Sequence, residues 1–94
     1  MNISFKYGLE SLKMMNEKMI HIFLITASQQ QMIEIQVSES GSFHDIISAL
    51  NEMNRTDLDC TNVLVYERES CLLCDMDVSL YSLNVTNGMV FEVY

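Results

Sequence analysis

The sequence predicts an α+β domain in which a mixed sheet packs on one helix. Two apolar segments, residues 19–27 and 32–37, are separated only by a short polar turn, which is typical of a β-hairpin. One segment with helical spacing follows, and shorter apolar segments lead to residue 94. The predicted order is β-β-α-β-β-β, and 94 residues with 49% hydrophobic content are enough for one domain.

The hairpin prediction depends on alternation. In residues 32–37 the apolar side chains alternate with Glu34 and Gln36, and strand side chains alternate between the two faces of a sheet. Residues 19–27 are apolar almost throughout, so only pairing decides which side chains face the core. We expect the core set of the hairpin to be Ile20, Ile22, Leu24, Ile33, Ile35 and Val37.

The helix prediction begins at Ser42. Ser42 can cap the helix, and Asp45 three residues later completes a pattern like a capping box. The helical apolar positions are Phe43, Ile46, Ile47, Leu50 and Met53, and the helix should end near Asn54 and Arg55.

Three further strands are expected after the helix. Residues 63–66 are β-branched or aromatic, residues 71–74 form a short apolar segment, and residues 89–94 alternate after a turn at Asn87 and Gly88. Leu80 and Leu83 should anchor an irregular turn before the last strand.

Residues 1–18 are predicted to be an N-terminal extension of a domain that spans residues 19–94. Ile3, Phe5 and Tyr7 alternate, and residues 9–18 could form a short helix with one apolar stripe. The apolar run after Lys18 superficially resembles a signal peptide, but it is short and its leader carries acidic residues. It is also far below the roughly 18 residues of a membrane span.

Charge and cysteine content limit the partners and the compartment. With 5 Lys+Arg against 13 Asp+Glu, the net charge of −8 opposes binding to nucleic acid or to an anionic membrane. An acidic surface could complement a basic protein, or it could simply keep the domain soluble. Three cysteines, an odd number, favour free thiols in a reducing compartment, so we expect a cytoplasmic protein with no membrane insertion.

The element order and the approach to the last strand resemble the ubiquitin-like β-grasp superfamily. Leu80, Leu83 and Val85, followed by Asn87 and Gly88, carry the resemblance over residues 19–94. Within that superfamily, residues 79–94 look closest to the YukD/EsaB-like proteins of Gram-positive type VII secretion loci. The resemblance implies a small cytosolic accessory or regulatory component of a secretion machine, without catalytic activity.

The end of the sequence bears on the chemistry that the fold supports. Ubiquitin and the sulfur carriers of this fold react through a Gly-Gly tail, whereas this sequence ends at Tyr94 on a predicted strand. Conjugation and sulfur transfer are therefore disfavoured, and a carrier protein lacking its tail is the alternative function. We also expect a C-terminal addition to impair binding more than an N-terminal tag.

Cofactor and enzyme sites are not predicted. Cys60, Cys71 and Cys74 lack the ferredoxin spacing, and with only His21 and His44 in addition they make an incomplete zinc set. The cysteines fit better as small apolar residues, and neither histidine lies in a catalytic pattern. A non-catalytic chain with no cofactor and no metal is the expectation.

A protein interface is predicted on the face of the sheet that points away from the helix. If every second strand residue faces the core, the residues between them point away from the helix. These residues form an apolar surface that includes tyrosines, and such surfaces commonly mark an interface. The resemblance implies the same face, because ubiquitin folds engage partners there. There are two alternatives to a partner protein. A helix in the N-terminal extension could fold over this face, or the chain could form a homodimer through it. The predicted interface residues are Phe23, Ile25, Leu64, Tyr66, Val90 and Tyr94.

Overall fold

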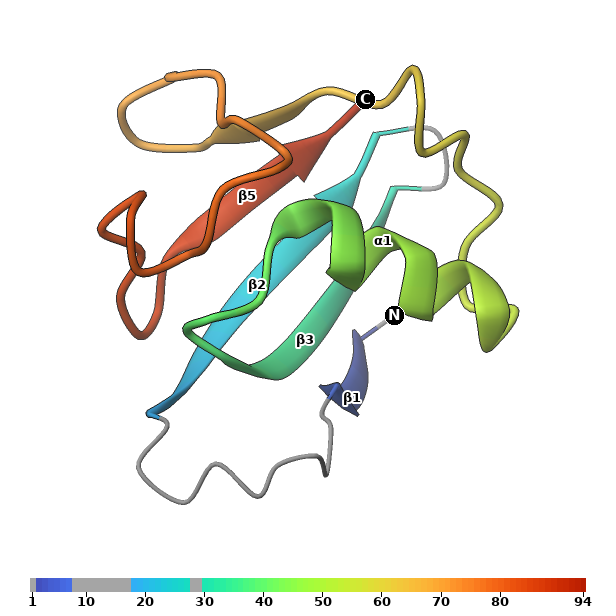
Figure 1. The fold of residues 1–94 in the computed structure, drawn as a ribbon. Helices are drawn as coiled ribbons and strands as arrows, with labels where there is room; N and C mark the ends of the chain where they lie inside the picture. Colours follow the sequence, from blue (N-terminus) through green and yellow to red (C-terminus); the bar gives the residue numbers. More distant parts are fainter. Residues whose placement is uncertain (1, 8–17, 28–29) are drawn as a thin grey trace.

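The computed structural model describes residues 2–7, 18–27 and 30–94, which form one five-stranded mixed sheet with a helix across one face (Figure 1). The strands are β1 (Asn2–Tyr7), β2 (Met19–Thr26), β3 (Gln31–Ser38), β4 (Val65–Glu67) and β5 (Val90–Val93), and the helix is α1 (Phe43–Glu52). Their order in the sheet is β1-β3-β2-β5-β4. The α+β expectation of a sheet on one helix is confirmed.

The hairpin has the predicted register. β2 and β3 pair antiparallel, with Ile22 opposite Ile35 and Leu24 opposite Ile33, so the predicted core set lies on one face. β5 then pairs parallel with β2, and β4 pairs antiparallel with β5. The Asn87 and Gly88 turn directs β5 along β2, since Gly88 has a φ of 88° and both residues bond to the backbone of His21.

The core lies between the sheet and α1. Phe43 of α1 and Phe91 of β5 meet edge to face with ring centroids 4.8 Å apart, and both are fully buried. Aromatic pairs favour this geometry. Of the residues expected to anchor the turn before β5, Leu80 is fully buried and Leu83 packs partly buried against the core.

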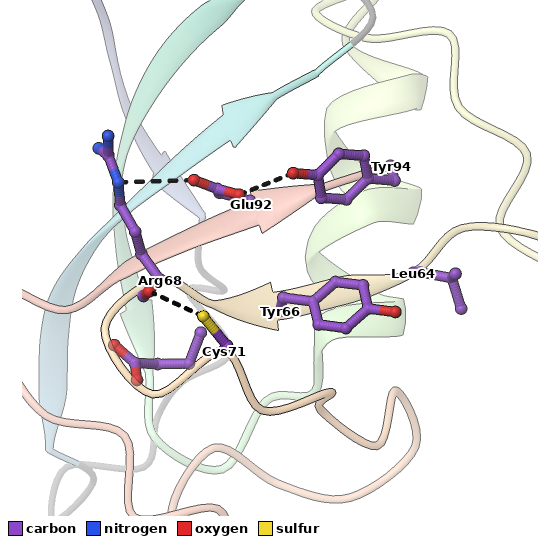
Figure 2. Close-up of a pocket in the computed structure, with 7 residues that line it drawn as sticks. Leu64, Tyr66, Arg68, Cys71, Glu92 and Tyr94 are labelled. Carbon is purple, nitrogen blue, oxygen red and sulfur yellow. Dashed lines mark hydrogen bonds and ion pairs between the residues drawn. The ribbon is translucent and has the colours of Figure 1, made fainter.

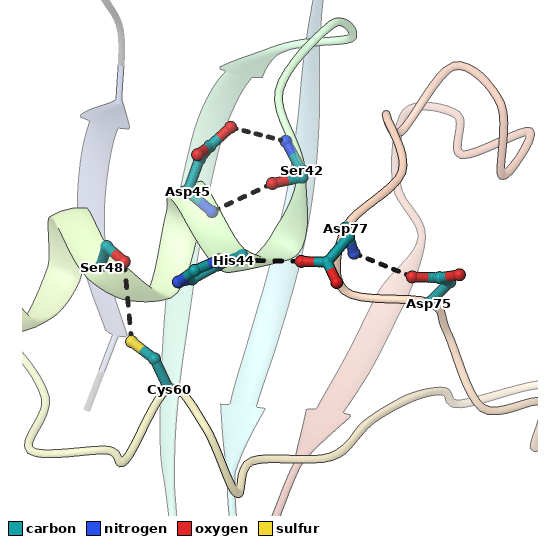
Figure 3. A network of polar contacts seen from close by, with 7 residues as sticks. All are labelled: Ser42, His44, Asp45, Ser48, Cys60, Asp75 and Asp77. Atoms are coloured by element: carbon teal, nitrogen blue, oxygen red, sulfur yellow. Dashed lines mark hydrogen bonds and ion pairs between the residues drawn. The ribbon is translucent and has the colours of Figure 1, made fainter.

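Ser42 starts α1 as predicted. Its Oγ accepts the backbone N–H of Asp45 at 3.1 Å, and the Asp45 carboxylate accepts the backbone N–H of Ser42 at 3.2 Å (Figure 3). This capping box satisfies two backbone donors at the helix start. The helix ends at Glu52, slightly earlier than predicted, and Asn54 follows with a φ of 58°.

A polar link fastens the end of α1 to the segment that leads to β4. The Asn51 amide donates to the carbonyl of Leu58 at 2.7 Å and accepts from the backbone N–H of Leu58 at 3.1 Å. The Thr56 hydroxyl also donates to Asn51. Nearer the start of the helix, Ser48 contacts the Cys60 sulfur at 3.6 Å (Figure 3).

Residues 71–74, which were expected to form a strand, do not. Only Leu73 makes an antiparallel bridge, to Tyr66. The chain turns back sharply because Cys71 adopts a φ of 61° and its backbone N–H donates to the carbonyl of Glu67. The Glu67 carboxylate accepts the backbone N–H groups of Glu69 and Ser70, which fixes the same turn.

The N-terminal segment differs from the predicted appendage in one respect. Residues 2–7 form β1, which pairs parallel with β3 and so belongs to the sheet. The helix expected over residues 9–18 lies outside the described residues except for Lys18. The division at residue 19 stays a prediction.

Candidate functional site

The face of the sheet that points away from α1 carries the predicted interface residues. We call this surface the outer face and define it as Phe23, Ile25, Leu64, Tyr66, Val90, Glu92 and Tyr94. β2 supplies Phe23 and Ile25, and β4 and β5 with their flanking residues supply the others. Most of them alternate with buried neighbours, because strand side chains point to opposite faces, and Val90 lies between half-buried Met89 and buried Phe91.

Register brings these side chains into rows across three strands. Phe23 lies opposite Val90, and Glu92 lies between Ile25 on one side and Tyr66 on the other. The described structure therefore places all six predicted interface residues on one surface. Their role in binding stays a prediction.

Two tyrosines of the outer face pack against each other, of which Tyr66 is half-buried and Tyr94 is exposed. The Tyr66 and Tyr94 rings meet edge to face, with centroids 5.9 Å apart and an interplanar angle of 82° (Figure 2). Tyr94 is 57% exposed, and Leu64 beside it is 45% exposed. Backbone bonds in both directions between Leu64 and Tyr94 hold the two residues together.

Glu92 organises the polar groups of this surface. It accepts the phenol O–H of Tyr94 at 2.8 Å through Oε1, and its Oε2 lies 3.5 Å from Arg68 Nε (Figure 2). The hydrogen bond and then the negative charge of Glu92 raise the pKa of Tyr94. Tyr94 therefore presents a neutral phenol whose hydroxyl is directed toward Glu92.

The aromatic residues line an open hollow of about 540 Å³. Arg68, Glu67 and Cys71 complete its wall, and sequence reasoning did not name them as site residues. Arg68 follows Tyr66 by two residues, so the alternation that identified Tyr66 could have found it. Cys71 reaches the hollow only through the tight turn after β4, where the Cys71 sulfur lies 3.8 Å from the Arg68 carbonyl oxygen.

The outer face continues toward β3. His21 and Phe23 are ring neighbours with centroids 5.3 Å apart, and the His21 ring contacts the Glu34 carboxylate at 2.6 Å. Phe23 and Ile25 are half-buried, whereas Leu64 and Tyr94 are exposed. The β4–β5 end therefore offers most of the accessible apolar surface.

The cysteines and the second histidine are the remaining candidate metal ligands of the sequence. Cys60, Cys71 and Cys74 are free thiols, and burial raises the pKa of Cys74. His44 at the start of α1 is exposed, and its Nδ1 lies 3.8 Å from the Asp77 carboxylate (Figure 3). In the described part of the chain, no cluster of three His, Cys, Asp or Glu side chains could hold a metal ion.

Comparison with solved structures yields many matches with the same architecture. Ubiquitin of Caldiarchaeum subterraneum matches with a TM-score of 0.65 at 16% identity, over 81% of this chain and 91% of that chain. A ubiquitin-like domain of an Arabidopsis thaliana protein matches with a TM-score of 0.68 at 12% identity, over 94% and 86%. This chain has the ubiquitin-like fold.

A third ubiquitin-like match is the C-terminal domain of mouse tubulin-specific chaperone e. Its TM-score is 0.64 at 18% identity, over 82% of this chain and 86% of that chain. No model of a known protein family and no curated protein matches the chain. At these low sequence identities, the matches with ubiquitin-like structures show a shared fold.

The described helix of the ubiquitin-like domain is not long and apolar enough to cross a membrane. The alternative in which an extension helix covers the outer face concerns residues that lie largely outside the description. Homodimerisation through the outer face likewise stays a prediction.

Proposed function

We propose that this ubiquitin-like chain is a non-catalytic protein-interaction module that binds another protein through its outer face. The observation that carries the proposal is the edge-to-face pair of half-buried Tyr66 and exposed Tyr94, which line an open hollow together with exposed Leu64. Tyrosine supplies a large rigid contact area together with a hydroxyl for hydrogen bonding, which suits the centre of an interface.

The lining of the hollow supports a proposal about the chemistry of the partner. Its accessible surface is largely apolar and aromatic, and the Glu92 carboxylate is already engaged by Arg68 and Tyr94. A partner that inserts an apolar side chain beside the tyrosines would bury their rings without leaving Glu92 unpaired. Buried polar groups cost little when they keep their hydrogen bonds.

We further propose that the module acts in the cytoplasm as an accessory or regulatory component of a type VII secretion system. This step rests on the resemblance of residues 79–94 to YukD/EsaB-like proteins. The turn at Asn87 and Gly88, central to that resemblance, has a structural task here because it bonds to His21 and aligns β5 with β2.

A complementation experiment tests the secretion role. In source cells lacking this gene, secretion of a small helical substrate of the type VII machine should require the wild-type chain. The Y66S/Y94S variant should fail to restore it, whereas Y81S should succeed, because Tyr81 is 69% exposed but lies outside the outer face. Normal secretion without the gene would reject the secretion role and leave binding by the outer face to be judged separately.

A further inference from the structure

The hollow of the outer face has a charged group at its centre as well as aromatic walls. Glu92 lies between Tyr66 and Ile25 in the register of the sheet, and Glu92 and Tyr94 both line the hollow. We propose that the partner segment which binds there carries an arginine or lysine side chain, which replaces Arg68 as the cation paired with Glu92. This inference rests on the proposed function, because it names the chemistry of the partner that the outer face binds.

The charge of the chain favours a basic partner. The sequence has 5 Lys+Arg against 13 Asp+Glu and a net charge of −8. Within residues 18–27 and 30–94, the Lys and Arg residues other than Arg68 are Lys18 and Arg55, and neither lines the hollow. Complementary charges speed encounter and select among partners. An acidic chain with an apolar hollow therefore fits a segment that is both apolar and basic.

The pair of Arg68 and Glu92 is loose. Arg68 Nε lies 3.5 Å from Glu92 Oε2, whereas a charge-assisted hydrogen bond is usually about 2.8 Å long. The Arg68 and Glu92 side chains are 56% and 30% exposed, and exposed ion pairs contribute little to stability. Figure 2 shows this single contact, with the end of the Arg68 guanidinium directed away from Glu92. A cation that approaches Glu92 more closely can therefore displace Arg68 at low cost.

Arg68 has a second hollow into which its side chain can turn. This open hollow of about 680 Å³ is also lined by Arg68, together with the exposed residue Glu69. The backbone of Arg68 is fixed, because its N–H donates to the carbonyl of Val90 at 2.8 Å. The side chain can therefore move from Glu92 toward Glu69 without disturbing the sheet, and it stays near a carboxylate when it does.

The two tyrosines suit the remainder of a basic side chain. Arginine and lysine pack their methylene stems on apolar surface, and their charged groups are attracted to aromatic rings. The Tyr66 and Tyr94 rings meet at 82°, and exposed Leu64 lies beside Tyr94, where an apolar residue of the same segment can pack. Tyr94 donates its hydroxyl hydrogen to Glu92 Oε1, so Oε2 is the oxygen that accepts the cation.

Three blocked peptides are the probes for this site. They are acetyl-Leu-Ser-Arg-amide, the same peptide with citrulline, which has the shape of arginine without its charge, and the same peptide with glutamate. Amide chemical shifts of the isotope-labelled full chain at physiological ionic strength measure binding over the millimolar range. The arginine peptide should bind about fivefold more tightly than the citrulline peptide, and the glutamate peptide should bind more weakly than either.

Two variants with opposite expected effects test the role of Glu92. E92Q removes the charge but keeps an acceptor for the Tyr94 hydroxyl, so it should reduce binding of the arginine peptide to the level of the citrulline peptide. R68Q removes the competing cation and should strengthen binding about threefold, which a misfolded variant could not do. E52Q and R55Q make the same charge changes at exposed positions away from the hollow and should bind as the wild type does.

The possible failures of the experiment are distinguishable. Equal binding of the arginine and citrulline peptides at the outer face would overturn the inference and leave the proposed binding surface standing. Binding of the arginine peptide to R68Q that is equal to or weaker than binding to the wild type would also overturn it, because Arg68 would then not compete. If none of the three peptides shifts the amides of Tyr66 and Tyr94, the outer face fails as a binding surface and the inference fails with it.

Discussion

The phenol of Tyr94 donates a hydrogen bond of 2.8 Å to the carboxylate of Glu92, two residues earlier on the same face of the sheet. The bond holds the exposed Tyr94 ring in place, beside the half-buried Tyr66 ring that it meets edge to face. Glu92 also contacts Arg68, so one carboxylate connects the polar and aromatic parts of the outer face. Contacts among the residues at the β4–β5 end of the outer face therefore fix the position of the Tyr94 ring.

Replacing Glu92 should change the titration of Tyr94. The raised pKa of Tyr94 means that its bond to Glu92 stabilises the fold below the ordinary tyrosine pKa of 10.0, and that this contribution is lost as pH rises through the higher native pKa. In E92Q the Tyr94 pKa should move down toward its ordinary value. The phenolate absorbance of each protein, with the matching Y94F spectrum subtracted, measures this, and identical titrations would contradict it.

Glu67 should make the turn after β4 sensitive to acid. Hydrogen bonds from Ser70 and then Glu69 lower the pKa of Glu67 below 4.5. The stabilisation is therefore complete above about pH 4.5 and is lost as pH falls through the lower native pKa.

Urea unfolding at several pH values tests this account of Glu67. The free energy of unfolding should fall less steeply on acidification in E67Q than in the wild type. E69Q removes one charge from the same turn and is the matched control, which should keep the wild-type slope. A slope in E67Q equal to that of the wild type would show that the carboxylate does not act in this way.

The Ser42 cap should contribute measurably to stability. S42A removes the acceptor for the Asp45 N–H and should lower the free energy of unfolding by about 1 kcal/mol. S42G should cost only a few tenths of a kcal/mol, because glycine is an adequate capping residue. Urea denaturation of the two variants measures the difference, and equal losses would argue against a role for the side chain.

Replacing Asn51 should lower the stability of the fold more than replacing an exposed asparagine. N51A leaves the backbone N–H and carbonyl of Leu58 without their side-chain partner, which should cost about 1–3 kcal/mol. N62A removes an exposed bond to Asp59 and should change stability by no more than about 0.5 kcal/mol. Thermal unfolding of both variants makes the comparison, and a similar small shift in each would contradict the prediction.

Most of the fold could be predicted because its signals are local or periodic. Alternation separated Ile22 and Ile35 from their outward neighbours, and Ser42 with Asp45 identified the helix start. The bridge at Leu73 in place of a strand could not be predicted, because it depends on the sharp turn at Cys71. The pairing of β1 with β3 is also non-local, and the alternation in residues 2–7 does not name its partner strand.

The outer face was predictable for the same reason as the hairpin. Tyr66 and Tyr94 follow from the burial of Val65 and Val93, their neighbours on the strands. What alternation alone could not supply is the geometry among them, namely the edge-to-face rings and the central position of Glu92. These depend on how β4 and β5 come into register.

Site-directed photo-crosslinking in the source cells tests most directly whether the outer face binds a protein. A photoreactive phenylalanine analogue would replace Tyr66 in one variant and Tyr81, which is exposed elsewhere, in the other. The account predicts a discrete adduct with another protein from position 66, which is lost when Leu64 and Tyr94 are both changed to serine, and none from position 81. No adduct from position 66, or the same adduct from both positions, would contradict it.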